Sequence, residues 1–301
     1  YLPDSGEGLR RGGRPVGAVL ADARAGKPIT ANEWRMLAFH SWETDESGLV
    51  APADRPALLA ELASECPPGD GETATRLWLK ALAASDDGQG VKPDAGLRRR
   101  VEQVLGDAAL SRTHMDVLGN GAADIVRVLT GEDEADRAAL SAQADAALAR
   151  LQADATLSRG DRVAALIERV DLARLGQPKD ATQPKLPASL VQEVREMSVR
   201  MDREIRDGYE RQAVITAVAY LLGQAGLWAD SDALLKANLA KSHSPYYLMS
   251  QLGSNARKLG RKDEALRWYE RAYDSSVGPA TRLQWGAGYV SALVDLAPEE
   301  A

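Results

Sequence analysis

Apolar residues recur at intervals of three and four along almost every stretch that lies between the glycines and prolines of this chain. That spacing places them on one side of an α-helix, whereas the alternation typical of a half-buried strand is essentially absent. Abundant alanine and a single phenylalanine, Phe39, also favour helices over sheets. The sequence therefore predicts an all-α fold of antiparallel helical hairpins.

The last third of the chain carries a recurrence at one fixed offset. Gly226 and Gly260 are 34 residues apart, and so are Pro245 and Pro279. This period is typical of the tetratricopeptide repeat, in which two antiparallel helices form one unit. A tetratricopeptide-like array is therefore predicted in the C-terminal third, with a final helix over 279–296 closing it.

Small residues should let the two helices of such a unit approach closely, and an aromatic side chain should fill the groove between them. Gly253 and Tyr269 occupy such places in the second repeat. The preceding repeat is a weaker match, because Ser231 and Asn238 stand where small apolar residues are usual. If a peptide or partner helix lies in the concave face of the array, the candidate groove residues are Asn255, Arg257 and Trp268.

Loop-forming composition predicts where the chain divides. The segment 85–94 is rich in Asp, Gly and Pro, and 176–187 contains three prolines. We expect an N-terminal helical segment over 1–90, a middle helical segment over 91–180 and the repeats over 181–301. A stripe of Leu190, Val194, Met197, Met201 and Ile205 is interpreted as packed core.

The charge balance limits the possible partners. A net charge of −7 and a pI near 5.2 argue against a dedicated nucleic-acid binder. Two basic clusters are interpreted as solvated helix faces, one of Arg10, Arg11 and Arg14 and the other of Arg98, Arg99 and Arg100. No apolar run approaches the roughly 20 residues of a membrane span, so none is expected.

The residues that could carry chemistry are few. Cys66 is the single cysteine, which excludes an intrachain disulfide and a Cys-x-x-Cys pair, and a buried structural thiol is expected. No histidine has metal-ligand spacing, and phosphate-binding loops are absent. We expect no catalytic residue, metal or cofactor. The alternative is a helical enzyme with a general base, formed by His40 with Glu43, Asp45 or Glu46, or by His114 with Asp116.

Two stretches near the ends of the chain are similar to one known family. One runs from Arg14-Pro15-Val16 through Trp34-Arg35-Met36-Leu37-Ala38-Phe39-His40-Ser41-Trp42-Glu43, and the other from Gly278-Pro279-Ala280-Thr281 through Trp285-Gly286. The first resembles the region just after the thioredoxin domain of proteobacterial exported thioredoxin-like proteins. The second resembles the C-terminal helical region of that family.

The resemblance implies a thioredoxin domain with a Cys-x-x-Cys site upstream of Tyr1, so this chain is expected to be a fragment. Residues 1–9 would be the remnant of the last helix of that domain. It also implies a periplasmic setting and thiol-disulfide exchange by the whole protein, but Cys66 matches no role of the redox site. This chain is expected to be a non-catalytic scaffold for protein or peptide partners, with its own thioredoxin domain as one candidate partner. A dimerisation spacer, suggested by the long helices around Leu140 and Met197, is a further alternative.

Overall fold

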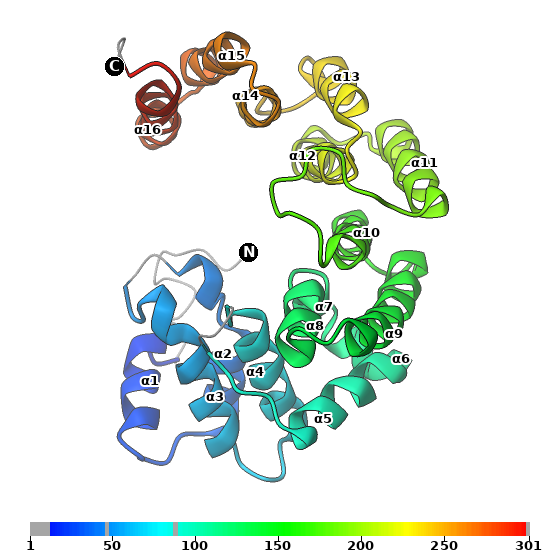
Figure 1. Ribbon diagram of the computed structural model, residues 1–301. Coiled ribbons are helices and arrows are strands. Elements are labelled where there is room, and N and C mark those ends of the chain that lie inside the picture. Colours follow the sequence, from blue (N-terminus) through cyan, green and yellow to red (C-terminus); the bar gives the residue numbers. More distant parts are fainter. Residues whose placement is uncertain (1–12, 46–47, 87–89, 299–301) are drawn as a thin grey trace. The chain divides into compact units, whose positions relative to one another are not determined.

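The computed structural model describes residues 13–45, 48–86 and 90–298 (Figure 1). Every regular element in these residues is a helix, which confirms the predicted all-α class. The chain forms two compact units, Tyr1–Ala144 and Asp145–Ala301. The division falls inside helix α9 (Glu134–Ala153), while the proline-containing segment 176–187 lies within the second unit. The three-part division over 1–90, 91–180 and 181–301 stays a prediction.

The first unit is a set of short helices, and buried apolar residues between positions 19 and 81 form a core within it. Leu37, Leu58 and Leu77 are buried at its centre, and the indole Nε1 of buried Trp42 donates to the Leu37 carbonyl oxygen at 2.8 Å. Its elements are α1 (Val16–Arg24), α2 (Ala31–Phe39), the 3-10 turns η2 (Trp42–Thr44) and η3 (Pro52–Asp54), α3 (Arg55–Glu65), α4 (Gly71–Ala83), α5 (Ala95–Gly106), α6 (Ala108–Thr113), α7 (Met115–Leu118) and α8 (Ala122–Thr130).

Side-chain caps fix where several of these helices begin. The Thr30 hydroxyl accepts from the Glu33 amide at 3.3 Å, and the Glu33 carboxylate accepts from the Thr30 amide at 2.7 Å. Each pair satisfies an amide that a helix start would otherwise leave unbonded. Asp70 and Asp94 accept from amides at the starts of α4 and α5 in the same way.

The second unit continues from α9 as a succession of longer helices. The stripe that includes Met197 and Met201 on α11 is buried in its core, as expected from its spacing. The helices are α10 (Arg159–Arg174), α11 (Ala188–Glu204), α12 (Gly208–Gln224), α13 (Trp228–Asn238), α14 (Tyr246–Lys258), α15 (Lys262–Ser275) and α16 (Pro279–Leu296).

The two glycines of the 34-residue period form equivalent turns. Gly226 joins α12 to α13 with φ 75°, and Gly260 joins α14 to α15 with φ 71°. In both turns the next amide donates back to a carbonyl five residues earlier, at 2.8 Å from Leu227 and from Arg261. This left-handed cap suits glycine because other residues rarely adopt a positive φ.

Within the α14–α15 hairpin, the absence of a side chain at Gly253 leaves room for the Tyr269 ring. A Cβ at position 253 would lie 2.9 Å from the Tyr269 ring, which is too close for real atoms. In the preceding hairpin, Ser231 and Asn238 are fully buried, and both are hydrogen-bonded to helix carbonyls, at Ala219 and Leu234 respectively. Polar residues thus fit apolar places there because their hydrogen bonds are satisfied. The tetratricopeptide assignment itself stays a prediction.

Among the described residues, no helix has the length and apolar character that crossing a bilayer requires.

Candidate functional site

The first unit carries a hollowed surface along α4 and α5. Two adjoining depressions of about 540 and 600 Å³ share Gly96 and Arg100 in their walls, and together they are called the α4–α5 groove here. The further residues that line them are Ala57, Ala60, Trp78, Gly90, Val91, Lys92, Asp94 and Leu97 on one side, and Gly71, Glu72, Thr75, Arg99, Gln103, Val104, Leu110 and His114 on the other.

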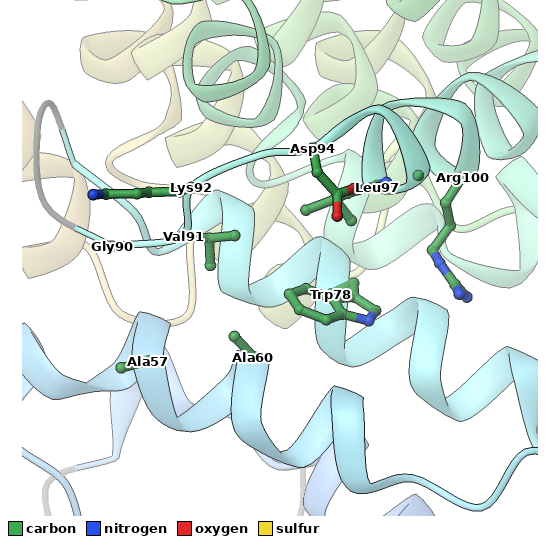
Figure 2. A pocket seen from close by; sticks show the side chains of 10 residues that line it. Ala57, Ala60, Trp78, Gly90, Val91, Lys92, Asp94, Leu97 and Arg100 are labelled. Atoms are coloured by element: carbon green, nitrogen blue, oxygen red, sulfur yellow. Dashed lines mark hydrogen bonds between the residues drawn. The ribbon is translucent and has the colours of Figure 1, made fainter.

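The first depression combines small residues with one large aromatic side chain. Figure 2 shows Trp78 between Ala60 on one helix and the segment from Asp94 to Leu97, with Arg100 beyond the nitrogen edge of the indole. Trp78 is partly buried, so one part of its ring packs against the core and another is open to a ligand. Walls of alanine and glycine around an indole leave room for an apolar side chain.

The electrostatics of the groove are set by α5 and the segment before it. Lys92 and Arg99 are exposed and form no ion pair with any described residue, and Arg100 donates to the Thr75 hydroxyl at 2.8 Å. In Figure 2 the Lys92 side chain extends away from Trp78, toward the rim. Arg98, on another side of α5, is held by Glu102 and Asp136 at 2.7 Å each.

The acidic residues of the groove are already engaged. The Asp94 carboxylate accepts from the Leu97 amide at 2.7 Å as the cap of α5, and Glu72 faces Arg35 at 3.7 Å. The lining of the groove thus contains three cations, at positions 92, 99 and 100, and two carboxylates, Asp94 and Glu72, so that cations are in excess. This arrangement attracts carboxylates despite the negative charge of the whole chain.

His114 lies in the wall of the second depression and is 1% exposed. Neither of its ring nitrogens has a hydrogen-bond partner among the described residues. Burial lowers the pKa of His114, and the nearby Arg76 guanidinium lowers it further. The side chain is therefore held neutral.

A second cavity of about 460 Å³ in the same unit is lined by Trp42, Glu43, Lys80 and Asp116, among others. Its charged groups form hydrogen bonds and ion pairs with other residues of the chain. Arg76 binds the Asp116 carboxylate through both of its terminal nitrogens, and the Lys80 ammonium donates to the His40 carbonyl at 2.7 Å. Burial alone would raise the pKa of Asp116, but Arg76 and then Lys80 hold it below its ordinary value. This cavity thus has a structural ion pair at its edge.

The predicted pair of His40 and Asp45 is loose. His40 Nε2 is 3.9 Å from the Asp45 carboxylate and has no hydrogen-bond partner among the described residues. Burial lowers the pKa of His40 more than Asp45 raises it. Glu46 lies outside the described residues. His114 and Asp116 do not act together either, because the Asp116 carboxylate is held by Arg76. The structure thus places neither histidine in hydrogen-bond contact with its predicted carboxylate.

The three predicted groove residues of the second unit have different surroundings. Asn255 is 1% exposed, and its amide donates to the Ser231 hydroxyl at 2.8 Å and to the Asp232 carboxylate at 2.9 Å. Trp268 is half-buried, with the Arg271 guanidinium 4.5 Å over its ring. Arg257 is exposed and pairs with Asp295 at 2.7 Å. Asn255 is thus an interior residue of the hairpins.

Cys66 is buried, as expected for a structural thiol. Its sulfur lies 3.7 Å from the Asp70 carbonyl oxygen, and burial raises the pKa of the thiol. The described residues contain no group of His, Cys, Asp and Glu side chains able to hold a metal ion. No family model, curated protein or solved structure matches this chain.

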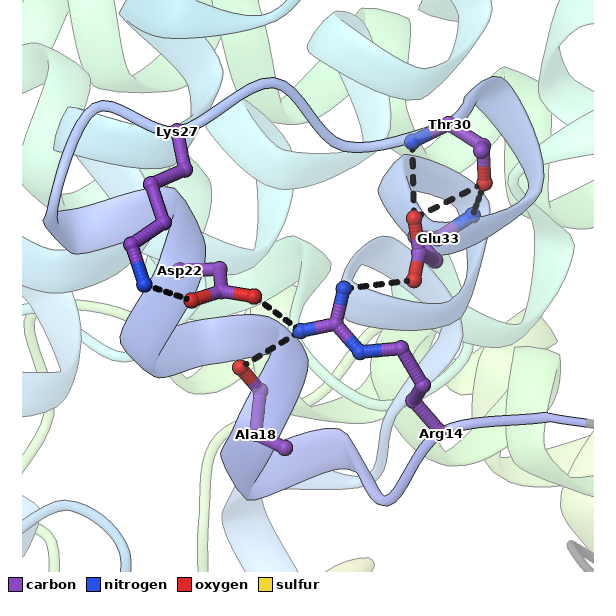
Figure 3. Close-up of polar contacts among 6 residues, drawn as sticks. All are labelled: Arg14, Ala18, Asp22, Lys27, Thr30 and Glu33. Carbon is purple, nitrogen blue, oxygen red and sulfur yellow. Dashed lines mark hydrogen bonds and ion pairs between the residues drawn. The ribbon is translucent and has the colours of Figure 1, made fainter.

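The basic clusters noted in the sequence have separate roles. Arg10 and Arg11 lie outside the described residues, while Arg14 bridges Asp22 on α1 and Glu33 on α2 (Figure 3). Arg14 therefore joins two helices and is not a free basic patch. In the second cluster, Arg100 lies in the groove. The run of arginines was the available signal, but Trp78 carried no signal that distinguished it from a core residue.

Proposed function

We propose that this chain is a non-catalytic, protein-binding scaffold and that its α4–α5 groove binds an acidic, extended segment of a partner protein. The observation that carries this proposal is the excess of cations along the α4–α5 groove, at a place where the neighbouring acidic groups are already bonded within the chain. Carboxylates of the partner would pair with Lys92, Arg99 and Arg100. An apolar side chain between them would lie against the indole.

The groove favours binding over catalysis for a physical reason. Its cations are guanidinium and ammonium groups, which donate hydrogen bonds but do not accept them, and His114 has no proton-relay partner among the described residues. Partly buried aromatic and arginine side chains are the residue types that contribute most to the affinity of protein interfaces. The same types surround this groove.

Fluorescence anisotropy with a matched peptide pair tests the proposal. One labelled peptide carries Asp and Glu around a central Leu, and the other carries Asn and Gln at the same places. We expect the acidic peptide to bind more tightly, with an affinity that falls as salt is raised because exposed charges are screened.

Two variants test whether the acidic peptide binds in the α4–α5 groove. Arg99→Glu with Arg100→Glu should weaken it by about tenfold or more, and Trp78→Ala should cost about 1–2 kcal/mol of binding free energy. Lys262→Glu with Arg267→Glu is the matched charge control, because both are exposed cations on α15 in the second unit. Equal affinity for the two peptides, or equal losses in the control, would contradict the proposal.

The family resemblance supplies the second part of the proposal, which is that the scaffold serves a periplasmic thioredoxin-like oxidoreductase. Cys66 supports the non-catalytic role of this chain, since a buried thiol with a raised pKa is a poor nucleophile. Insulin reduction with dithiothreitol tests this part. The chain and its Cys66→Ala variant should be equally inactive, while a protein that also carries the thioredoxin domain should be active. Activity that depends on Cys66 would contradict it.

A further inference from the structure

The outer face of α16 presents an apolar stripe that no described residue of its own unit covers. Leu283, Val290 and Val294 are 76%, 57% and 54% exposed, and Ala280 and Ala287 are exposed beside them. These positions are spaced three, four, three and four residues apart, which is the spacing of a coiled-coil seam. The opposite face, with Trp285 and Ala292, packs inward.

The stripe also lacks charge. Helix α16 has 18 residues and only two charged side chains, Arg282 and Asp295. Arg282 lies over the Tyr273 ring at 4.5 Å, and Asp295 pairs with Arg257 at 2.7 Å, so both are engaged within the second unit. The polar residues nearest the seam are Gln284 and Ser291, which are neutral. An acidic or basic partner would therefore gain nothing from this face.

Monomeric proteins rarely expose a continuous apolar seam of this kind. Exposed leucine and valine side chains in one continuous seam mark a contact surface. The seam is complementary to itself in size. If two copies of α16 pack antiparallel, Leu283 meets Val294 of the second copy and Ala287 meets its Val290, so that each layer pairs a larger side chain with a smaller one. A parallel pair would place Ala287 against Ala287 and leave a gap.

We propose that the seam of α16 is the contact through which two copies of this chain associate, with the two helices antiparallel. Antiparallel packing also aligns the helix dipoles favourably. Two helices of this length bury on the order of 1,000 Å² in all, which is near the lower limit for a specific interface. The dimer should therefore depend on protein concentration. This inference is independent of the α4–α5 groove.

Sedimentation equilibrium on the full chain over a range of concentrations tests the proposal. We expect a monomer–dimer equilibrium in which Val290→Asp raises the dissociation constant about tenfold or more, because a charge would be buried in the seam. Val199→Asp is the matched control, since Val199 is 65% exposed on α11, away from the seam. Both positions are exposed, so circular dichroism should show that both variants fold. A strict monomer at high concentration, or equal effects of the two variants, would overturn the proposal.

Cysteine cross-linking tests the direction of the helices. In a Cys66→Ala background, Leu283→Cys combined with Val294→Cys should form a disulfide-linked dimer on mild oxidation. Leu283→Cys alone should not. Efficient cross-linking by the single variant would overturn the antiparallel arrangement, and absence of cross-linking in the double variant would overturn the seam as the contact.

Discussion

His114 shows how strongly one residue depends on its surroundings. A histidine near an aspartate in the sequence suggests an acid–base pair. In the structure, however, Arg76 binds the Asp116 carboxylate, and the buried imidazole has no hydrogen-bond partner among the described residues. Protonating the His114 ring is unfavourable because it would place a buried cation beside the Arg76 guanidinium. Its main consequence should be a dependence of stability on pH.

Because the pKa of His114 is lowered in the folded state, the unfolded chain binds a proton first as the pH falls. The free energy of unfolding of the first unit should therefore decrease as the pH drops below about 6.5, the ordinary histidine value. His114→Leu should flatten this decrease, and urea titrations between neutral and mildly acidic pH measure it. The pKa of His40 is lowered too, so His40→Asn should flatten it in the same direction. An unchanged slope in both variants would contradict this account.

Asn255 shows that the tertiary contacts of a single residue are not predicted from the sequence. It was predicted to contact a peptide in the concave face of the repeats, but its partners Ser231 and Asp232 lie in the neighbouring hairpin. Only the packing of α13 against α14 brings them together. Arg98, Arg99 and Arg100 are consecutive, and neighbouring residues on a helix point in different directions. Sequence alone therefore did not show that Arg100 lies in the groove whereas Arg98 does not.

At the scale of elements, local chemistry predicted the structure well. The capping box at Thr30 and the final helix over Pro279–Leu296 follow the expected residues. Gly226 and Gly260 form matching turns because the same backbone conformation is needed at both. The 34-residue period predicts the backbone conformation of the two turns but not their tertiary surroundings, which differ.

The two glycines should therefore respond differently to alanine. Gly260→Ala should cost about 1 kcal/mol of unfolding free energy, because only the positive φ is strained. Gly226→Ala should cost more, since its Cβ would also lie 3.1 Å from Pro184 and 3.3 Å from the Thr182 carbonyl oxygen, whereas nothing lies within 4 Å at position 260. Thermal or urea unfolding of the two variants compares them. Equal losses would show that the contact at Pro184 is not maintained in solution.

At the scale of the whole molecule, each unit has a core of its own. The cluster with Leu77 draws its residues from 19–81, and the cluster with Met201 from 163–252. Leu77→Ala and Met201→Ala should each cost about 2–5 kcal/mol, as expected for a cavity in a packed core. Hydrogen exchange should show the loss of protection mainly in the unit that carries the change, so each variant is the control for the other. Equal loss across both units would show that they unfold as one.

Photo-cross-linking of the acidic peptide to the chain tests the central claim most directly. With a photoreactive group on its central apolar residue, we expect adducts on the segments that surround Trp78, namely 57–60 and 90–100, and their loss when Arg99 and Arg100 are both changed to Glu. Adducts near Arg257 and Trp268, or adducts that the neutral peptide forms equally well, would contradict the assignment of the α4–α5 groove as the binding site.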